Sequence, residues 1–177
     1  IVRADRASDI LFLINFSIEK NIRLIISGGS EAWMVAKQLA KTKIPVILEP
    51  INNLPSSFNQ LGARLDNASI LNKAGVKILI ASHETHNSYL SRQAAGIAVS
   101  YGLPWDVALK SITSNVAEVF GLKKIGMVKI GYTADLIIWG KDPLEVSAFA
   151  QQIYISGKLM SNESRSTRLR DRYLNLD

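Results

Sequence analysis

The chain has 177 residues, of which 47% are hydrophobic and 20% charged, and its formal net charge is +6. A chain of this length buries roughly 70% of its unfolded surface when compact, so it can hold a core of its own. No apolar run approaches the roughly 20 residues that a membrane-spanning helix needs. The 21 Lys and Arg residues are scattered, and the densest group is interleaved with acidic residues. We therefore expect no membrane and no nucleic acid as a partner.

The chain contains no Cys, which excludes disulfides and thiolate chemistry but leaves its compartment open. Cytoplasmic, periplasmic and secreted locations all agree with this composition. The sequence opens on Ile-Val-Arg-Ala, without an initiator Met or an apolar leader. Because this opening falls inside a predicted strand, we expect the chain to be a fragment of a longer protein.

Strands and helices alternate over the first half of the chain. Short aliphatic runs predict strands, and amphipathic segments between them predict helices: strands at residues 1–4, 23–26, 45–48 and 76–81, helices at 6–19, 30–41 and 67–73. Residues 49–66 have two prolines and little periodicity, which predicts a long loop of a kind that is often functional. Successive strand–helix units form a parallel sheet. Four units leave two open edges, so we expect a missing half or a second copy to cover them.

The pattern changes in the second half of the chain. Three helices are predicted between residues 88 and 121, and strands follow at residues 126–130, 134–139 and 152–160, with turns at Gly131 and at Ser156 and Gly157. The polar tail is either a marginal helix or disordered. The predicted organisation is therefore an α/β domain at 1–122, a β segment at 123–160 and a tail at 161–177.

Both histidines of the chain lie in one polar loop directly after the fourth predicted strand. Parallel α/β folds build their sites at the carboxyl ends of strands. His83 and His86 can share a metal ion, or a histidine can act as a general base that Glu84 orients. The structural alternative is that these side chains hydrogen-bond to hold the loop closed.

Two other strand ends carry candidate binding residues. Gly28 and Gly29 follow the second strand, where their backbone N–H groups can face a phosphate or carboxylate, or where they simply make a tight turn. Asp5 and Arg6 follow the first strand. They either pair with each other or cap the next helix, or they contact a ligand at the same rim as His83.

Two passages in the second half of the chain, residues 94–122 and residues 125–145, together resemble the amidohydrolase family, close to its imidazolonepropionase-like branch. Residues 94–122, AAGIAVSYGLPWDVALKSITSNVAEVFGL, are similar to the helices that follow the eighth barrel strand, and residues 125–145, IGMVKIGYTADLIIWGKDPLE, to the segment where the chain enters a small β sandwich. The resemblance covers residues 1 to about 160. It implies the C-terminal half of a (β/α)8 TIM barrel followed by strands of a β sandwich, with a structural role for Asp135.

The resemblance also implies a chemistry. Amidohydrolases hold divalent cations through His and Asp ligands, and the bound water attacks an amide carbonyl. The intact protein is thus expected to use a divalent metal, zinc first, and to hydrolyse a non-peptide C–N bond in a cyclic amide or related small molecule. The family's ligand positions fall here at Arg3 or Asp5, near Gly28, and at His83. A standard binuclear site cannot be built from these residues, because Gly offers no ligand and Arg repels a cation.

The candidate site residues follow from these positions: His83 and Glu84 for catalysis, His83 and His86 for metal, and Arg3, Asp5, Ser27, Gly28 and Asn87 for substrate binding. Three interpretations stay open. The intact protein uses one metal with ligands from a missing half, or it works without metal, or this domain is catalytically degenerate and serves binding or scaffolding. In each case we expect the chain alone to be inactive.

Overall fold

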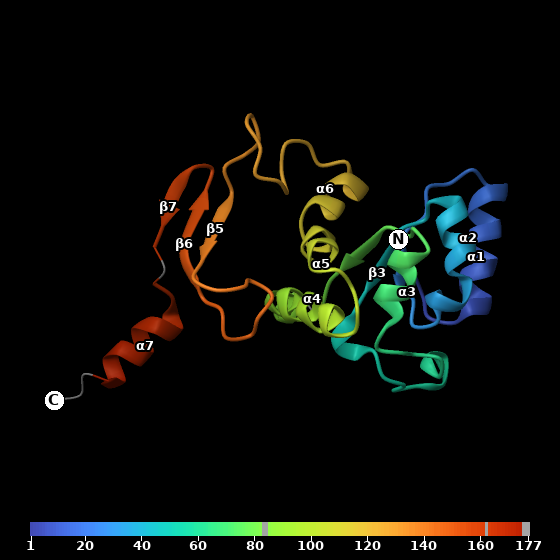
Figure 1. Cartoon of the computed structure of the whole chain (residues 1–177), viewed down its shortest axis with the longest axis horizontal. Helices are drawn as coiled ribbons and strands as arrows, with labels where there is room; N and C mark the ends of the chain where they lie inside the picture. The colour runs from blue at the N-terminus through green and yellow to red at the C-terminus, as the bar shows by residue number, and fades with distance from the viewer. Residues whose placement is uncertain (83–84, 162, 175–177) are drawn as a thin grey trace. The chain divides into compact units, whose positions relative to one another are not determined.

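The structure is a computed structural model that describes residues 1–82, 85–161 and 163–174, with the backbone alone at residues 85 and 87. It divides into two compact units, unit 1 at Ile1–Gly126 and unit 2 at Met127–Asp177 (Figure 1). In the described part of the chain, no helix has the length and apolar character needed to cross a membrane.

Unit 1 is built on a parallel sheet of four short strands in the order β1-β2-β3-β4. The strands are β1 (Val2–Ala4), β2 (Ile26–Gly28), β3 (Val46–Leu48) and β4 (Ile78–Ile80). One register row joins Ile26, Val46 and Ile78, and these side chains are at most 1% exposed. Buried aliphatic residues without alternation are typical of a parallel sheet that is covered on both faces. The predicted parallel sheet is confirmed.

Helices cover the sheet on its two sides, with α1, α2 and α3 on one side and α4, α5 and α6 on the other (Figure 1). The first three are α1 (Ala7–Glu19), α2 (Ala36–Thr42), which follows the 3-10 turn η1 (Ala32–Val35), and α3 (Asn67–Lys73). Each buries aliphatic side chains such as Ile10, Leu39 and Leu71, which are fully buried. This mixed architecture, with a parallel sheet between helices, is the α/β class that the alternation predicts.

On the second side, α6 packs against the other register row of the sheet. The helices there are α4 (Ser91–Ser100), α5 (Trp105–Ser111) and α6 (Ser114–Phe120), preceded by the 3-10 turn η4 (Thr85–Leu90). Val119 of α6 joins Ile25 and Leu79 in a buried cluster. Gly121 ends α6 in the left-handed conformation at φ +69°, as its position after the helix predicts.

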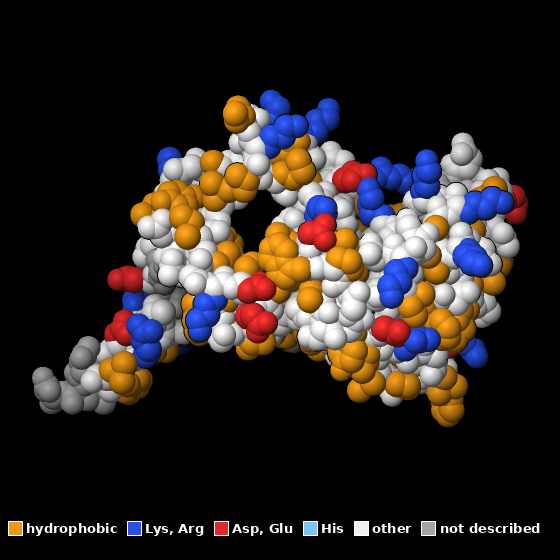
Figure 2. Space-filling view, in the orientation of Figure 1, with side chains coloured by type: hydrophobic (Ala, Val, Ile, Leu, Met, Phe, Trp, Pro, Cys, Tyr) orange, Lys and Arg blue, Asp and Glu red, His pale blue; other side chains and the backbone are white. Residues whose placement is uncertain are grey.

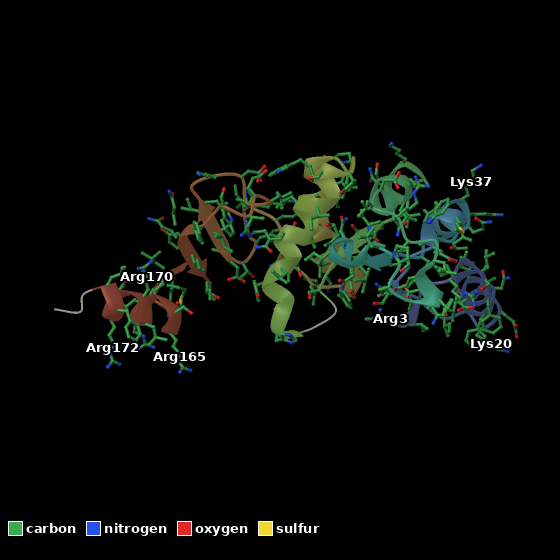
Figure 3. The ribbon with its side chains drawn as sticks, turned by 90° about the horizontal axis from the view of Figure 1, so that it is seen from below. Arg3, Lys20, Lys37, Arg165, Arg170 and Arg172 are labelled. Atoms are coloured by element: carbon green, nitrogen blue, oxygen red, sulfur yellow. The ribbon has the colours of Figure 1, made fainter. Side chains whose placement is uncertain are left out.

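Unit 2 contains an antiparallel sheet and a final helix. Its elements are β5 (Leu136–Trp139), β6 (Ala150–Ile155), β7 (Lys158–Met160) and α7 (Arg165–Leu174). The turn between β6 and β7 falls at Ser156 and Gly157, as expected, with both residues at positive φ. Asp135 accepts a hydrogen bond from the backbone N–H of Ser156 at 2.7 Å, which fixes this turn. The arginines of α7, three of which Figure 3 labels, lie on an exposed helix.

Two predicted strands differ from the structure. The second strand is Ile26–Gly28 rather than residues 23–26, because its pairing with both neighbours begins at Ile26, which lies opposite Val2 of β1 and Val46 of β3. Residues 126–130 form no strand. Val128 and Ile130 are 88% and 101% exposed, and an extended segment without a partner strand leaves its backbone groups unpaired, so turns replace it there.

Candidate functional site

A small recess lies where the carboxyl ends of β1, β2 and β3 meet. We call it the rim recess, and its volume is about 10 Å³. Eight residues line it, from these strand ends and from residues 49–66, which we call the rim loop: Arg3, Asp5, Gly28, Ser30, Glu49, Asn52, Asn53 and Gln60. The recess therefore brings together three of the residues predicted for substrate binding. Its size suits one water molecule or one oxygen atom of a larger ligand.

Asp5 links two strand ends at the rim recess. Its Oδ1 accepts hydrogen bonds from the hydroxyl of Ser30 at 2.8 Å and from the Ser30 backbone N–H at 3.3 Å. Its Oδ2 lies 3.7 Å from Nε of Arg3, and its side chain is only 11% exposed. Asp5 thus joins the end of β1 to the turn after β2 instead of capping α1, whose N-cap residue is Arg6.

The turn after β2 depends on Gly28. Its φ is +93°, and a Cβ atom there would lie 2.7 Å from Oδ1 of Asp5. Only glycine fits this combination of positive φ and close approach. The next two backbone N–H groups are already engaged, that of Gly29 with the carbonyl of Ala4 and that of Ser30 with Asp5. This geometry favours the tight-turn interpretation over an anion site at the glycines.

Arg3 supplies the positive charge of the rim recess. It lies on β1 opposite Ser27 of β2, and its side chain is 44% exposed. Figure 3 shows it apart from Lys20 and Lys37, two other cations of unit 1. Its guanidinium keeps its charge at any physiological pH. Arg3 can therefore donate hydrogen bonds to a ligand while Asp5 holds its other side.

The remaining predicted site residues are not brought into this recess. Ser27 is half-buried within β2 and does not line the recess. His86 lies in η4 and is exposed. His83, Glu84 and the side chain of Asn87 lie outside the described residues. The catalytic role of His83 and Glu84 thus stays a prediction.

The divalent cation that the resemblance implies has no fitting donor set in the described part of the chain. No three or more His, Cys, Asp or Glu side chains come close enough there to bind a metal ion. At the rim itself, Asp5 is engaged with Ser30 and Arg3, and the guanidinium would repel a cation. The described residues therefore do not form a metal centre.

The rim loop is held in place by Glu31, which sequence reasoning did not single out. Its carboxylate accepts hydrogen bonds from the backbone N–H of Ala7 at 2.9 Å and of Gly62 at 3.2 Å. Trp33 donates its indole N–H to the carbonyl of Gly62 at 2.8 Å, and the Arg64 guanidinium lies 4.7 Å from the centre of the Trp33 ring. These contacts fix the far end of the loop to η1 and to the start of α1.

Arg64 is in turn paired with Asp66 in a two-pronged ion pair. The hydrogen bond from the Arg64 guanidinium, more than their charge attraction, lowers the pKa of the Asp66 carboxyl from its usual value. The rim loop thus ends in a defined arrangement just before α3.

Four residues of the rim loop line the recess, and sequence reasoning missed all of them: Glu49, Asn52, Asn53 and Gln60. The prolines and weak periodicity of residues 49–66 do predict a long loop of a kind that is often functional. The concentration of amide and carboxylate side chains in the loop that follows β3 could have indicated these residues. The short 3-10 turns η2 (Pro50–Asn52) and η3 (Phe58–Gln60) give the segment its shape, which no periodicity reveals.

A larger cavity, of about 660 Å³, opens at the opposite end of the sheet, where the strands begin. Arg23, Lys77 and Glu118 are among its lining residues, but Arg23 donates to the carbonyl of Val119, and Lys77 pairs with Glu118. Their charges thus hold α6 against the sheet. Parallel α/β folds use this end for stability rather than for chemistry.

Comparison with known proteins agrees with this architecture. The chain matches the amidohydrolase family over residues 6–160. It is similar to the crystal structure of an amidohydrolase from Thermotoga maritima, with a TM-score of 0.83 and 30% identity, over 91% of this chain and 43% of that one. It shares the fold of an uncharacterized metal-dependent hydrolase from Pyrococcus furiosus, with a TM-score of 0.59 and 18% identity, over 81% of this chain and 34% of that one.

In sequence, 58 residues are 41% identical to the amidohydrolase tasK of Hapsidospora irregularis, a stretch that is 32% of this chain and 6% of that protein. The chain therefore spans less than half the length of these relatives. Its parallel sheet corresponds to part of a TIM-barrel-type fold, and its match to the family extends over most of its length. The chain belongs to the amidohydrolase family.

Proposed function

We propose that the chain is the C-terminal half of an amidohydrolase of the imidazolonepropionase-like branch. The complete protein would hydrolyse a non-peptide C–N bond in a cyclic amide or a related small molecule. The observation that carries this proposal is the rim recess, a polar site at the carboxyl ends of three barrel-type strands in a chain of this family. The family match supports a hydrolytic reaction, and the polar lining of the recess supports substrate binding at this rim.

The residues of this chain act on the substrate in this proposal. Arg3 donates hydrogen bonds to a substrate oxygen, and Asp5 orients Arg3 from a position that Ser30 fixes. Gly28 leaves the space that Asp5 occupies. Arg3, Asp5 and Gly28 therefore bind and orient, and we assign them no part in moving a proton.

A divalent metal, with zinc as the first candidate, would supply an activated water in the complete protein. Because the described residues do not fit such an ion, its ligands would come from elsewhere, with His83 and His86 as the contribution of this chain. We assign no catalytic step through the metal here. The proposal is thus a hydrolase whose ligand set departs from that of its family.

One observation supports a second candidate function. Arg3 stands at a strand end where the family places a metal ligand, and it is held there by Asp5. A domain that has exchanged a ligand for a fixed cation can bind the same small molecules without hydrolysing them. The rival proposal is therefore a catalytically degenerate amidohydrolase-like domain with a binding or scaffold role.

Metal content separates the two proposals. We would measure metal stoichiometry by elemental mass spectrometry on the longest natively purified form, for the wild type and for the double variant His83→Ala, His86→Ala, and would assay both against a panel of cyclic amides. The hydrolase proposal expects about one metal per chain and measurable turnover, both lost in the double variant. A metal-free wild type without turnover would instead support the degenerate domain.

A further inference from the structure

The large cavity where the strands of unit 1 begin, which we call the base cavity, receives a cation from each of three neighbouring strands. Arg23, Lys43 and Lys77 are among the residues that line it. Arg23 and Lys43 stand three residues before β2 and β3, and Lys77 stands one residue before β4. Neighbouring strands of a sheet are about 4.8 Å apart, so the parallel topology brings these three cations to one place.

Positive charge outweighs negative charge around the base cavity. Among the described residues that line it, Glu118 is the one carboxylate, and it pairs with Lys77. The guanidinium of Arg23 donates to the carbonyl of Val119 and has further N–H groups to donate. Figure 2 shows several Lys and Arg side chains along the upper edge of unit 1, where Figure 1 places α6. Three cations against one carboxylate favour an anionic ligand.

The rest of the lining is largely apolar. Aliphatic side chains from helix ends and strand starts form it: Ile18, Ile22, Leu24, Ile44, Pro45 and Val119. Ser17 and Thr42 also line the cavity, but their hydroxyls donate to backbone carbonyls of their own helices. The volume of about 660 Å³ falls within the range of small-molecule sites, about 300–1,000 Å³. Charged groups beside apolar walls suit a ligand with one anionic end and one apolar end.

We propose that the base cavity binds a small amphipathic carboxylate, with its anionic group held by Arg23 and Lys43 and its apolar body against Ile22 and the neighbouring aliphatic side chains. A ligand in this place contacts the start of β2 and the end of α2, and Arg23 already connects β2 to α6. The ligand therefore stabilises the folded state of unit 1 by binding it. This inference does not depend on the function proposed for the rim recess.

The test uses three probes: benzoate, the neutral benzamide of the same shape, and acetate, which has the charge without the ring. Their affinities for the 177-residue chain would be measured by NMR titration at constant ionic strength. We expect benzoate to shift the backbone amide resonances of residues 22–24 and 42–45. Benzoate should bind at least about fivefold more tightly than either other probe, because each of them lacks one of the two groups that the cavity contacts.

Two variants with matched controls locate the site. Lys43→Gln should weaken benzoate binding about threefold, because it removes one of the two cations that hold the carboxylate. Lys41→Gln, which removes an exposed cation from the last turn of α2 outside the cavity lining, should change nothing. Ile22→Ala should also weaken benzoate about threefold. Ile51→Ala is its control, since Ile51 of the rim loop is 42% exposed and Ile22 is 48% exposed.

The alternative is that these cations only neutralise the carboxyl-terminal ends of α1 and α2, which carry partial negative charge. Benzamide binding as tightly as benzoate, or no benzoate-induced shifts at the cavity, would support that alternative and overturn the inference. Equal weakening by Lys41→Gln and Lys43→Gln would also overturn it, because benzoate would then respond only to general positive charge. Lys43 is exposed, so its variant should keep the fold. If it does not, the comparison of the three probes on the wild type decides.

Discussion

Replacement of Gly28 by Ala tests the arrangement of the rim most directly. The new side chain faces two penalties. The left-handed φ of +93° strains an L-residue by roughly 1–2 kcal/mol, and a Cβ atom 2.7 Å from Oδ1 of Asp5 would break its hydrogen bonds to Ser30, which are worth roughly 1.5–3 kcal/mol because the acceptor is charged. Gly28→Ala should therefore lower the free energy of unfolding by roughly 2.5–5 kcal/mol. Urea denaturation followed by circular dichroism would measure the loss.

Gly75 provides the matched control. Its φ is +86°, almost the same as that of Gly28, but nothing lies within 4 Å of the Cβ position. Gly75→Ala should show the backbone strain alone, roughly 1–2 kcal/mol. In an Asp5→Ala background, Gly28→Ala should fall to that same value, because the clash is gone. Equal losses for the two glycines in the wild-type background would refute the close approach of Asp5.

The other predictions concern single contacts. Glu31→Ala removes the acceptor that anchors the rim loop and should lower the free energy of unfolding by about 2 kcal/mol. Amide hydrogen exchange in that loop should become faster, and unchanged exchange would mean that other contacts hold the loop. Asp135→Ala should lower the stability of the turn between β6 and β7 by about 1 kcal/mol, because the Ser156 N–H loses its acceptor. In NMR spectra the Ser156 amide proton resonance should then shift upfield. The lowered pKa of Asp66 gives a pH dependence: its pairing with Arg64 stabilises the fold above the ordinary carboxyl pKa, and this contribution is lost as the pH falls through the lowered pKa. Asp66→Asn should remove that part of the acid-induced loss in a denaturation series, and an identical pH profile would contradict it.

The alternation of strands and helices in unit 1 could be predicted because each element repeats a short aliphatic run or a helical face. The prediction is less accurate at the ends of the second strand, because its pairing with β1 and β3 begins only at Ile26, and an aliphatic run does not show where its partners begin. The prediction of a strand at residues 126–130 was wrong for a related reason. An apolar, β-branched run such as that around Val128 forms a strand only where a neighbour pairs with it, and a partner cannot be read from the run itself.

The candidate site was predictable only in part. Arg3 and Gly28 lie on β1 and β2, and Asp5 directly follows β1, so their place at one rim came from the topology of a parallel sheet. Asn53 and Glu49 lie in an irregular loop, where neighbours are set by contacts far along the chain, such as that of Glu31 with Gly62. Sequence reasoning could recognise that this loop is unusual, but its inward-facing residues required the structure.

The brevity of the strands has a consequence for how unit 1 moves. Each of β1 to β4 has three residues, so each ladder contains few hydrogen bonds and no strand can persist without the side-chain packing around it. Ile26, Val46 and Ile78 form the row that joins the strands. Amide protons of this sheet should therefore exchange through one shared opening event rather than strand by strand, and β2 and β3, which have neighbours on both sides, should open only when the whole sheet does.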